Sequence, residues 1–201
     1  MNQIEALRKI RALGVTGFET RDIATLLGVS PANASVLLSR LARSGLVRRV
    51  SRGLWAAGDG IGTDRLVEQL AAPYPAYVSL QSALFKRGLI EQMPSVVYAA
   101  TPGRGRRVST PLGAVSFHRI PAALFEGFTV DANGVKVATA EKALFDLLYL
   151  GPSRSRLFTR LPEIELPRSF QWGQVRKWID KIHGKSRRAF VAKRLAELRS
   201  S

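Results

Sequence analysis

Short polar side chains followed by arginines occupy one face of a helix predicted to begin at Pro31. The positions on this face are Asn33, Ser35, Val36, Ser39, Arg40 and Arg43. Small polar side chains near the start of a helix let its backbone approach base edges in the major groove of DNA. Arginines further along reach phosphates and fix the register on the duplex. Asn33 and Ser35 are therefore candidate base contacts, and Arg40 and Arg43 are candidate phosphate contacts.

Further arginines lie in a predicted hairpin, which consists of residues 46–50, a tip at 51–53 and residues 54–57. Its arginines Arg48, Arg49 and Arg52 could follow the DNA backbone or enter the minor groove. Secondary candidates for nucleic-acid contacts lie in a glycine-broken turn and near the C-terminus, and a solvated loop explains the turn equally well. These candidates are Arg104, Arg106, Arg107, Arg187, Arg188, Lys193 and Arg194.

Two short helices and a turn must position these side chains. Thr20 is the predicted N-cap of the first helix, Gly28 supplies the turn, and Ser30-Pro31 starts the second helix, which Gly45 ends. The predicted buried stripe of the second helix is Ala34, Leu37, Leu38 and Leu41. An earlier helix, with Ile4, Leu7, Ile10 and Leu13 facing inward, is expected to pack beneath both after a linking turn at 14–18.

Helix, turn, helix and basic hairpin in this order predict a winged helix-turn-helix that binds DNA. A small helical domain with a solvated basic face and a protein-binding winged helix are the alternatives.

Charge in the 201-residue chain gathers at its two ends. The formal net charge is +16, which indicates a polyanionic partner. Residues 1–58 hold nine Lys/Arg and three Asp/Glu, and residues 168–201 hold ten and two. Residues 59–167 hold twelve and ten, so the middle is nearly neutral.

The chain has no cysteine, which excludes disulfides, thiolate metal sites and a cysteine nucleophile. The N-terminal segment is amphipathic and lacks the apolar stretch of a signal peptide, and no apolar run is long enough to span a bilayer. We expect a soluble cytoplasmic protein.

A glycine-rich break at 58–62 predicts two domains, 1–58 and 59–201. The second is expected to mix helices at 63–70 and 79–88 with strands at 95–100, 107–110, 114–120, 125–130 and 135–138. A helix capped by Thr139 follows, then a basic linker over 152–160 and two terminal basic helices. The fold class is α+β, a winged helix-turn-helix joined to a mixed α/β C-terminal domain that ends in basic helices.

Enzymatic chemistry has little support in the sequence. The two histidines, His118 and His183, lie in different regions, and no metal-binding spacing surrounds them. A nuclease would have to use Asp131, Glu141 and Lys142, but adjacent side chains at 141 and 142 diverge by about 100° on a helix. We expect no catalytic site, no metal and no cofactor.

Three stretches in order carry a resemblance to a known family. They are residues 51–56 (SRGLWA) at the end of the hairpin, residues 77–84 (YVSLQSAL) with 88–92 (GLIEQ), and residues 138–148 (ATAEKALFDLL). Together they resemble the AbiEi family of bacterial antitoxins, the regulatory half of type IV toxin–antitoxin modules of abortive infection. The likeness runs over most of the chain, from about residue 1 to residues 161–166 and the basic terminal helices.

The resemblance implies an N-terminal domain that binds inverted repeats in the promoter of its own operon and represses it cooperatively. It implies a C-terminal domain that carries antitoxicity and assists DNA binding, for which Lys142, Arg176 and residues 187–194 are the candidate surface. The functional partner would be a nucleotidyltransferase-like toxin, opposed without a stable complex, and no membrane is involved.

Two other functions stay open on the residues alone. One is a winged-helix regulator with a ligand-sensing C-terminal domain, and the other is a charge-driven nucleic-acid-binding protein without sequence preference. A specific repressor discriminates its own promoter at physiological salt, whereas a charge-driven binder loses affinity steeply with salt.

Overall fold

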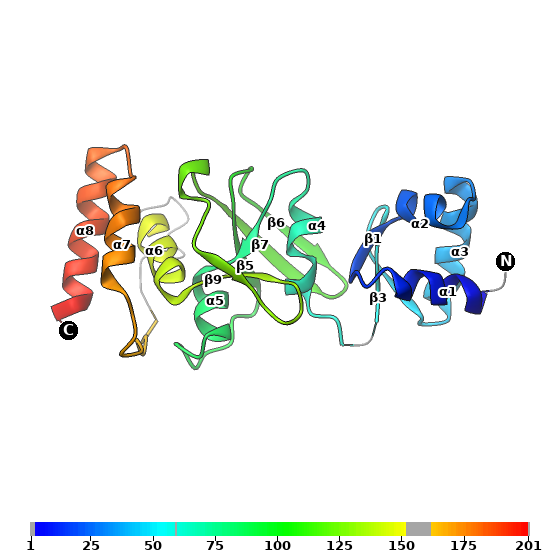
Figure 1. The fold of residues 1–201 in the computed structure, drawn as a ribbon, viewed down its shortest axis with the longest axis horizontal. Coiled ribbons are helices and arrows are strands. Elements are labelled where there is room, and N and C mark those ends of the chain that lie inside the picture. Colours follow the sequence, from blue (N-terminus) through cyan, green and yellow to red (C-terminus); the bar gives the residue numbers. More distant parts are fainter. Residues whose placement is uncertain (1–2, 59, 152–161, 201) are drawn as a thin grey trace.

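The computed structural model describes residues 3–58, 60–151 and 162–200. They form an elongated molecule, with the N-terminal helices at one end, a six-stranded sheet in the middle and the last two helices at the other end (Figure 1). This mixture of helices and strands confirms the predicted α+β class. None of the helices in these ranges has the length and apolarity that a membrane crossing requires.

A winged helix-turn-helix occupies the N-terminal end. Its elements are α1 (Gln3–Ala12), β1 (Gly17–Glu19), α2 (Thr20–Leu27), α3 (Pro31–Arg43), β2 (Val47–Ser51) and β3 (Leu54–Ala57). The linking turn predicted over 14–18 is wrong in its second half, because β1 pairs with β3 and completes a sheet in the order β1-β3-β2. A strand of three residues depends on that long-range pairing and leaves no periodic pattern in the sequence.

The start of α3 agrees with the prediction. Ser30 is the N-cap, its hydroxyl accepts the N–H of Asn33 at 3.2 Å, and Pro31 occupies the first turn. Gly28 ends α2 with a φ of 63°, in the left-handed region that glycine adopts without a steric penalty. The turn between the two helices is therefore built as the sequence indicates.

The predicted cap of α2 is wrong by one residue. Glu19 is the N-cap, and it forms a capping box with Asp22, whose carboxylate accepts the N–H of Glu19 at 2.8 Å. Thr20 lies within the helix, where its hydroxyl has other partners.

The first helix buries only its middle. Ala6 and Ile10 are fully buried, but Ile4 is 74% exposed and Leu13 is 39% exposed, so the predicted inward stripe is wrong at both ends. A spacing of three residues lags the helical repeat by about 60° at each step, so positions 4 and 13 lie on opposite sides of the helix.

The middle of the molecule is a mixed sheet in the order β6-β7-β5-β4-β9-β8. Pairs β5–β7 and β4–β9 are parallel, and the other three pairs are antiparallel. The strands are β4 (Tyr77–Val78), β5 (Val97–Thr101), β6 (Arg106–Thr110), β7 (Gly113–Arg119), β8 (Phe128–Val130) and β9 (Lys136–Ala138). The two-residue strand β4, which joins the two halves of the sheet, was not predicted.

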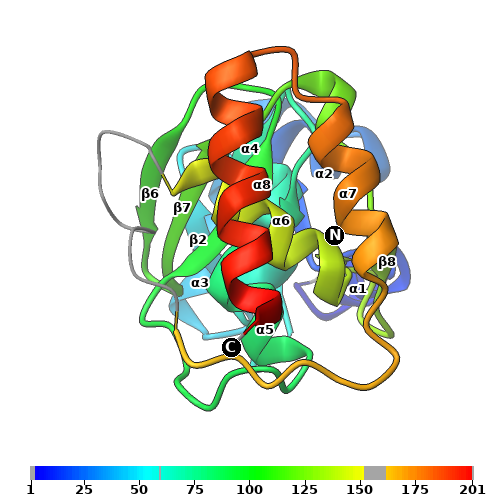
Figure 2. The same cartoon turned by 90° about the vertical axis from the view of Figure 1, so that its left-hand side faces the viewer.

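Helices flank this sheet and form the C-terminal end. They are η1 (Thr63–Leu66), α4 (Val67–Ala71), α5 (Leu80–Lys86), η2 (Ala122–Leu124), α6 (Ala140–Leu150), α7 (Trp172–Asp180) and α8 (Lys185–Ser200), η marking a 3-10 helix. The last two confirm the predicted terminal helices, and α8 faces outward with α6 behind it in the end-on view (Figure 2). The predicted linker at 152–160 and Leu161 lie outside the described residues.

The terminal helices attach through one apolar cluster. Val175, Trp178 and Ile179 of α7 pack with Leu144 and Phe145 of α6. The helix α7 therefore packs on α6 through its apolar face.

The wing sheet is apolar on both faces. Phe18 and Trp55 belong to the core beneath the three N-terminal helices. Leu54 and Ala56, whose side chains point the other way, belong to the cluster that also contains Leu66 and the central sheet. The division at residue 58 stays a prediction, but the apolar packing continues across it.

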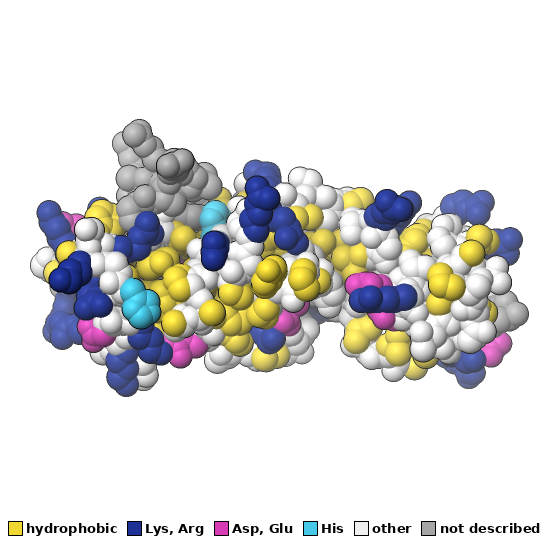
Figure 3. All heavy atoms as spheres, turned by 90° about the horizontal axis from the view of Figure 1, so that it is seen from above, with side chains coloured by type: hydrophobic (Ala, Val, Ile, Leu, Met, Phe, Trp, Pro, Cys, Tyr) yellow, Lys and Arg dark blue, Asp and Glu magenta, His cyan; other side chains and the backbone are white. Residues whose placement is uncertain are grey.

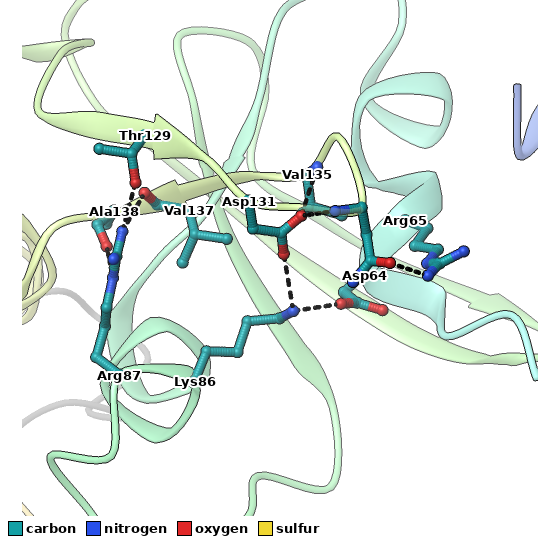
Figure 4. Close-up of polar contacts among 10 residues, drawn as sticks. Asp64, Arg65, Lys86, Arg87, Thr129, Asp131, Val135, Val137 and Ala138 are labelled. Carbon is teal, nitrogen blue, oxygen red and sulfur yellow. Dashed lines mark hydrogen bonds and ion pairs between the residues drawn. The ribbon is translucent and has the colours of Figure 1, made fainter. Parts of the chain in front are cut away.

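Polar contacts hold η1 on the central sheet, directly after the glycine-rich break (Figure 4). The Lys86 ammonium lies 2.7 Å from Asp64 and 3.5 Å from Asp131 in the β8–β9 turn. Arg65 donates to the side chain of Asn133 in the same turn. The helix η1, which follows the winged helix in the chain, is thus tied to α5 and to the β8–β9 turn.

Candidate nucleic-acid interface

The two faces of α3 separate as the sequence predicted. Ala34, Leu38 and Leu41 are fully buried, and Leu37 is half-buried. The six predicted contact residues are all exposed: Asn33, Ser35, Val36, Ser39, Arg40 and Arg43. The helix therefore offers short polar groups near its N-terminus and two arginines near its C-terminus, which is the arrangement that major-groove reading requires.

The wing arginines do not share one face. In the antiparallel pairing of β2 with β3, Arg49 lies opposite Trp55, and Arg48 lies opposite Ala56. Paired residues point to the same side of a sheet, so Arg49 is on the helix side, where its guanidinium is 5.7 Å from the Trp55 ring centroid. Arg48 is on the side of the central sheet. Arg52 is exposed at the tip, between the two strands.

A contact that the sequence analysis missed holds the wing tip against α2. The Thr20 hydroxyl accepts a hydrogen bond from the Trp55 indole N–H at 2.9 Å and donates one to the carbonyl of Gly53. The backbone N–H of Thr20 binds the same carbonyl at 2.9 Å. A buried indole N–H needs a hydrogen-bond acceptor. The tryptophan at position 55 was therefore the signal in the sequence for such a contact. The tip is consequently fixed relative to the helix-turn-helix.

The secondary candidates at residues 104–107 differ in whether their guanidinium groups bind other parts of the fold. Arg104 and Arg107 are exposed. Arg106 donates to the carbonyl of Leu70 at 2.7 Å and lies over the ring of Phe117, so its guanidinium holds α4 on the sheet. Nucleic-acid contact by these three residues stays a prediction.

The C-terminal candidates also divide. Arg187 donates to the carbonyl of Tyr149 at 2.7 Å, Arg188 donates to the carbonyl of Ile182 at 2.8 and 2.6 Å, and Arg194 lies 3.9 Å from Glu197. Lys193 is exposed on α8. Arg187 therefore links α8 to α6, Arg188 links it to the segment after α7, and Arg194 pairs within α8.

Lys142 lies in a buried polar network, which corrects its assignment to a C-terminal surface. Its side chain is fully buried, and its Nζ lies 2.5 Å from the Asp146 carboxylate one helical turn away. Tyr77 and Ser79 donate to the other carboxylate oxygen at 2.9 and 2.7 Å. Burial, with the charge of Asp146, raises the pKa of Tyr77 above its usual value. A lysine and an aspartate four residues apart in an apolar helix were the missed signal.

Aromatic rings enclose the same ammonium group. The Nζ of Lys142 is 4.6 Å from the ring centroid of Phe145 and 5.4 Å from that of Trp178 on α7. Cation–π attraction is strongest where water is excluded. The network therefore joins α6, β4 and α7 inside the fold.

The residues weighed for a nuclease do not act together. Asp131 binds Lys86, Glu141 accepts the backbone N–H of Gln171, and Lys142 is paired with Asp146. In the described ranges, no three His, Asp or Glu side chains are grouped as metal ligands. Burial lowers the pKa of His118 to about 4, and its Nε2 lies 2.9 Å from the Ser116 hydroxyl.

Comparison with known protein families finds a match in the N-terminal segment. Residues 17–58 match the AbiEi_4 family, described as "Transcriptional regulator, AbiEi antitoxin". The match runs from β1 to the end of the wing and confirms the predicted resemblance over this segment. The chain has no match among curated proteins.

Proposed function

We propose that this protein binds double-stranded DNA in a sequence-specific manner through α3 and represses transcription. The observation that carries the proposal is the exposed face of α3, where Asn33 and Ser35 precede Arg40 and Arg43 on a helix fixed by three buried side chains. The family that matches residues 17–58, and therefore α3, is described as a transcriptional regulator. Arg49 and Arg52 on the fixed wing would contact the backbone beside the same groove.

The family match favours an antitoxin that regulates its own operon. We propose that the target is the upstream promoter, with inverted repeats, and that the protein belongs to a type IV toxin–antitoxin module in the cytoplasm. The toxin would be nucleotidyltransferase-like, encoded next to the antitoxin and opposed without a stable complex. We propose a regulatory role without catalysis, since the residues weighed for cleavage have separate structural partners.

A gel-shift titration tests DNA binding. The purified protein is titrated against its own upstream DNA and against a random duplex of equal length, at about 150 mM salt, where purely electrostatic binding is weak. We expect strong preference for the upstream fragment, with stepwise shifts. Equal and weak binding to both duplexes would refute sequence-specific repression and support the charge-driven alternative.

Co-expression tests the antitoxin role separately. The adjacent gene is induced with and without this protein, and growth is followed. We expect growth to be rescued while an affinity tag on the antitoxin recovers no toxin. Growth arrest that persists in both cultures would refute the antitoxin role and leave only the regulatory role.

A further inference from the structure

The two basic ends of the chain are also the two ends of the folded molecule. The winged helix and the helices α7 and α8 are separated along the long axis by the central sheet (Figure 1). Lys and Arg side chains crowd the C-terminal end of the surface, and others lie over the winged helix (Figure 3). The two positively charged surfaces therefore lie at opposite ends of the fold.

The outer face of α8 carries cations among small side chains. Val191 and Leu195 point inward. Lys193 is exposed on the opposite side of the helix, and Lys185 is exposed on its flank. Ser186, Ala189, Ala192 and Ala196 are exposed between and beside them, as are Arg188, Phe190 and Glu197. Arg176 and Lys177 of α7 and Arg199 of α8 add exposed charge at the same end. We call Lys185, Lys193 and Arg199 the end cations.

The end cations differ from the neighbouring arginines. Arg187 and Arg188 are bound to backbone carbonyls, whereas no ion pair among the described residues includes an end cation. A helix of 16 residues extends about 24 Å, so its charges can face several phosphates of a duplex. Phe190 is the only large apolar side chain exposed on this helix, at 39%. A protein partner would need a larger apolar anchor, so a phosphate backbone is the better match.

The direction of α8 keeps this surface away from DNA held by α3. The helix closes the end of the molecule, and its outer face points along the long axis, away from the winged helix (Figure 2). The link between the ends is packed: a Cβ on Gly17 of β1 would lie 2.7 Å from Leu66, so β1 is in close contact with η1. Lys86 in turn ties η1 to the sheet.

We propose that the end cations bind the backbone of a second DNA duplex, so that one protein molecule bridges two duplex segments. This inference rests on the proposed DNA binding by α3 and adds to it a separate contact that reads charge and no sequence. The second segment could be a distant part of the same operon or another molecule.

A capture assay tests the bridge. A biotinylated upstream fragment is fixed on beads, and a fluorescent random duplex is added with the full-length protein. We expect the wild-type protein to retain the fluorescent duplex. Lys185→Glu/Lys193→Glu/Arg199→Glu should lower its retention by about tenfold or more while its gel-shift affinity for the upstream fragment stays within about threefold.

A matched variant controls for total charge. Arg8→Glu/Arg11→Glu/Arg119→Glu changes three exposed cations outside every candidate contact surface by the same amount, and we expect it to keep bridging. Circular dichroism of both triple variants checks that they fold. As salt is raised, retention of the second duplex should be lost before binding to the upstream fragment, because the second contact is purely electrostatic.

Three results would overturn the inference. The wild-type protein could shift the upstream fragment yet retain no second duplex, the end-cation variant could still bridge, as a dimer with two winged helices would, or the control variant could lose bridging equally. A wild-type protein that does not bind the upstream fragment would refute the proposed function itself, and the bridge with it.

Discussion

A charged residue has an entirely different role in this protein according to whether the fold exposes or buries it. Arg40 on α3 is exposed to solvent. Lys142 is inside the molecule, where Asp146 and two ring faces surround its ammonium group. Residue type alone treats both as cations available to a partner. Burial makes the first a candidate contact and the second a structural residue.

Asn33 tests base reading at the level of one side chain. Asn33→Ala should lower the preference for the operator over random DNA by about 1–3 kcal/mol, because a base contact contributes only on the correct sequence. Gel-shift titrations on both duplexes measure this preference. Gln3→Ala on α1 removes an exposed amide from another helix and should change neither affinity. Equal losses on both duplexes for Asn33→Ala would exclude a base contact.

Variants of Lys142 and Lys86 compare the stability contribution of a buried ion pair with that of a partly exposed one. Lys142→Met leaves Asp146 buried without its cation and should lower the free energy of unfolding by about 3–5 kcal/mol. Lys86→Met removes a partly exposed lysine from two carboxylates and should cost about 0–1 kcal/mol. Urea denaturation of both variants gives the comparison. Similar losses would mean that the buried network contributes no more than a surface ion pair.

Strand pairing decides what the wing offers to DNA. Arg48 and Arg49 are neighbours in sequence, but the alternation of a strand sends them to opposite sides of the sheet. The helix side also carries the indole of Trp55, which holds the Arg49 guanidinium in place. The central sheet lies on the other side, so the two arginines are unequal candidates.

This inequality predicts different salt effects. Arg49→Ala should weaken binding to every duplex and reduce the slope of log K against log salt by about one, as expected for one lost phosphate contact. Arg48→Ala should leave the slope closer to that of the wild type. Titrations at several salt concentrations determine both slopes. A larger effect for Arg48 would place the DNA on the opposite side of the wing.

At the scale of the whole molecule, the wing sheet packs against two apolar cores, one on each of its faces. Phe18 and Trp55 pack under the N-terminal helices, and Leu54 packs with Leu66 on the other side. The winged helix is consequently held by side chains of its own wing. Its position relative to the C-terminal end depends on this packing, and the proposed bridge between two duplexes needs that position to be kept.

Leu54 tests the connection between the two halves. Leu54→Ala should destabilise the protein by about 2–5 kcal/mol and separate thermal unfolding into two transitions, because it removes packing between the wing and η1. Leu38→Ala removes a buried leucine of the same size from the α3 core and should destabilise without separating the halves. Differential scanning calorimetry distinguishes the two. A single transition for Leu54→Ala would show that other contacts between the halves, such as the close approach of Gly17 to Leu66, are sufficient.

The sequence by itself determined the local features whose cause is local. Ser30-Pro31 starts α3 wherever it is placed, because a cap and a proline act on their own turn. The apolar spacing of Ala34, Leu38 and Leu41 selects the buried face, and the opposite face with Asn33 follows from it. The family match at residues 17–58 covers this same helix and its turn.

Only the tertiary structure decided what depends on residues far apart in the chain. The strand β1, the pairing of Thr20 with Trp55 and the burial of Lys142 beside Tyr77 need partners between 35 and 65 positions away. No periodic pattern encodes such partners, because the free energy of each contact appears only when the chain has brought them together. The separation of the two basic ends has the same origin, since the central sheet that lies between them forms by long-range pairing.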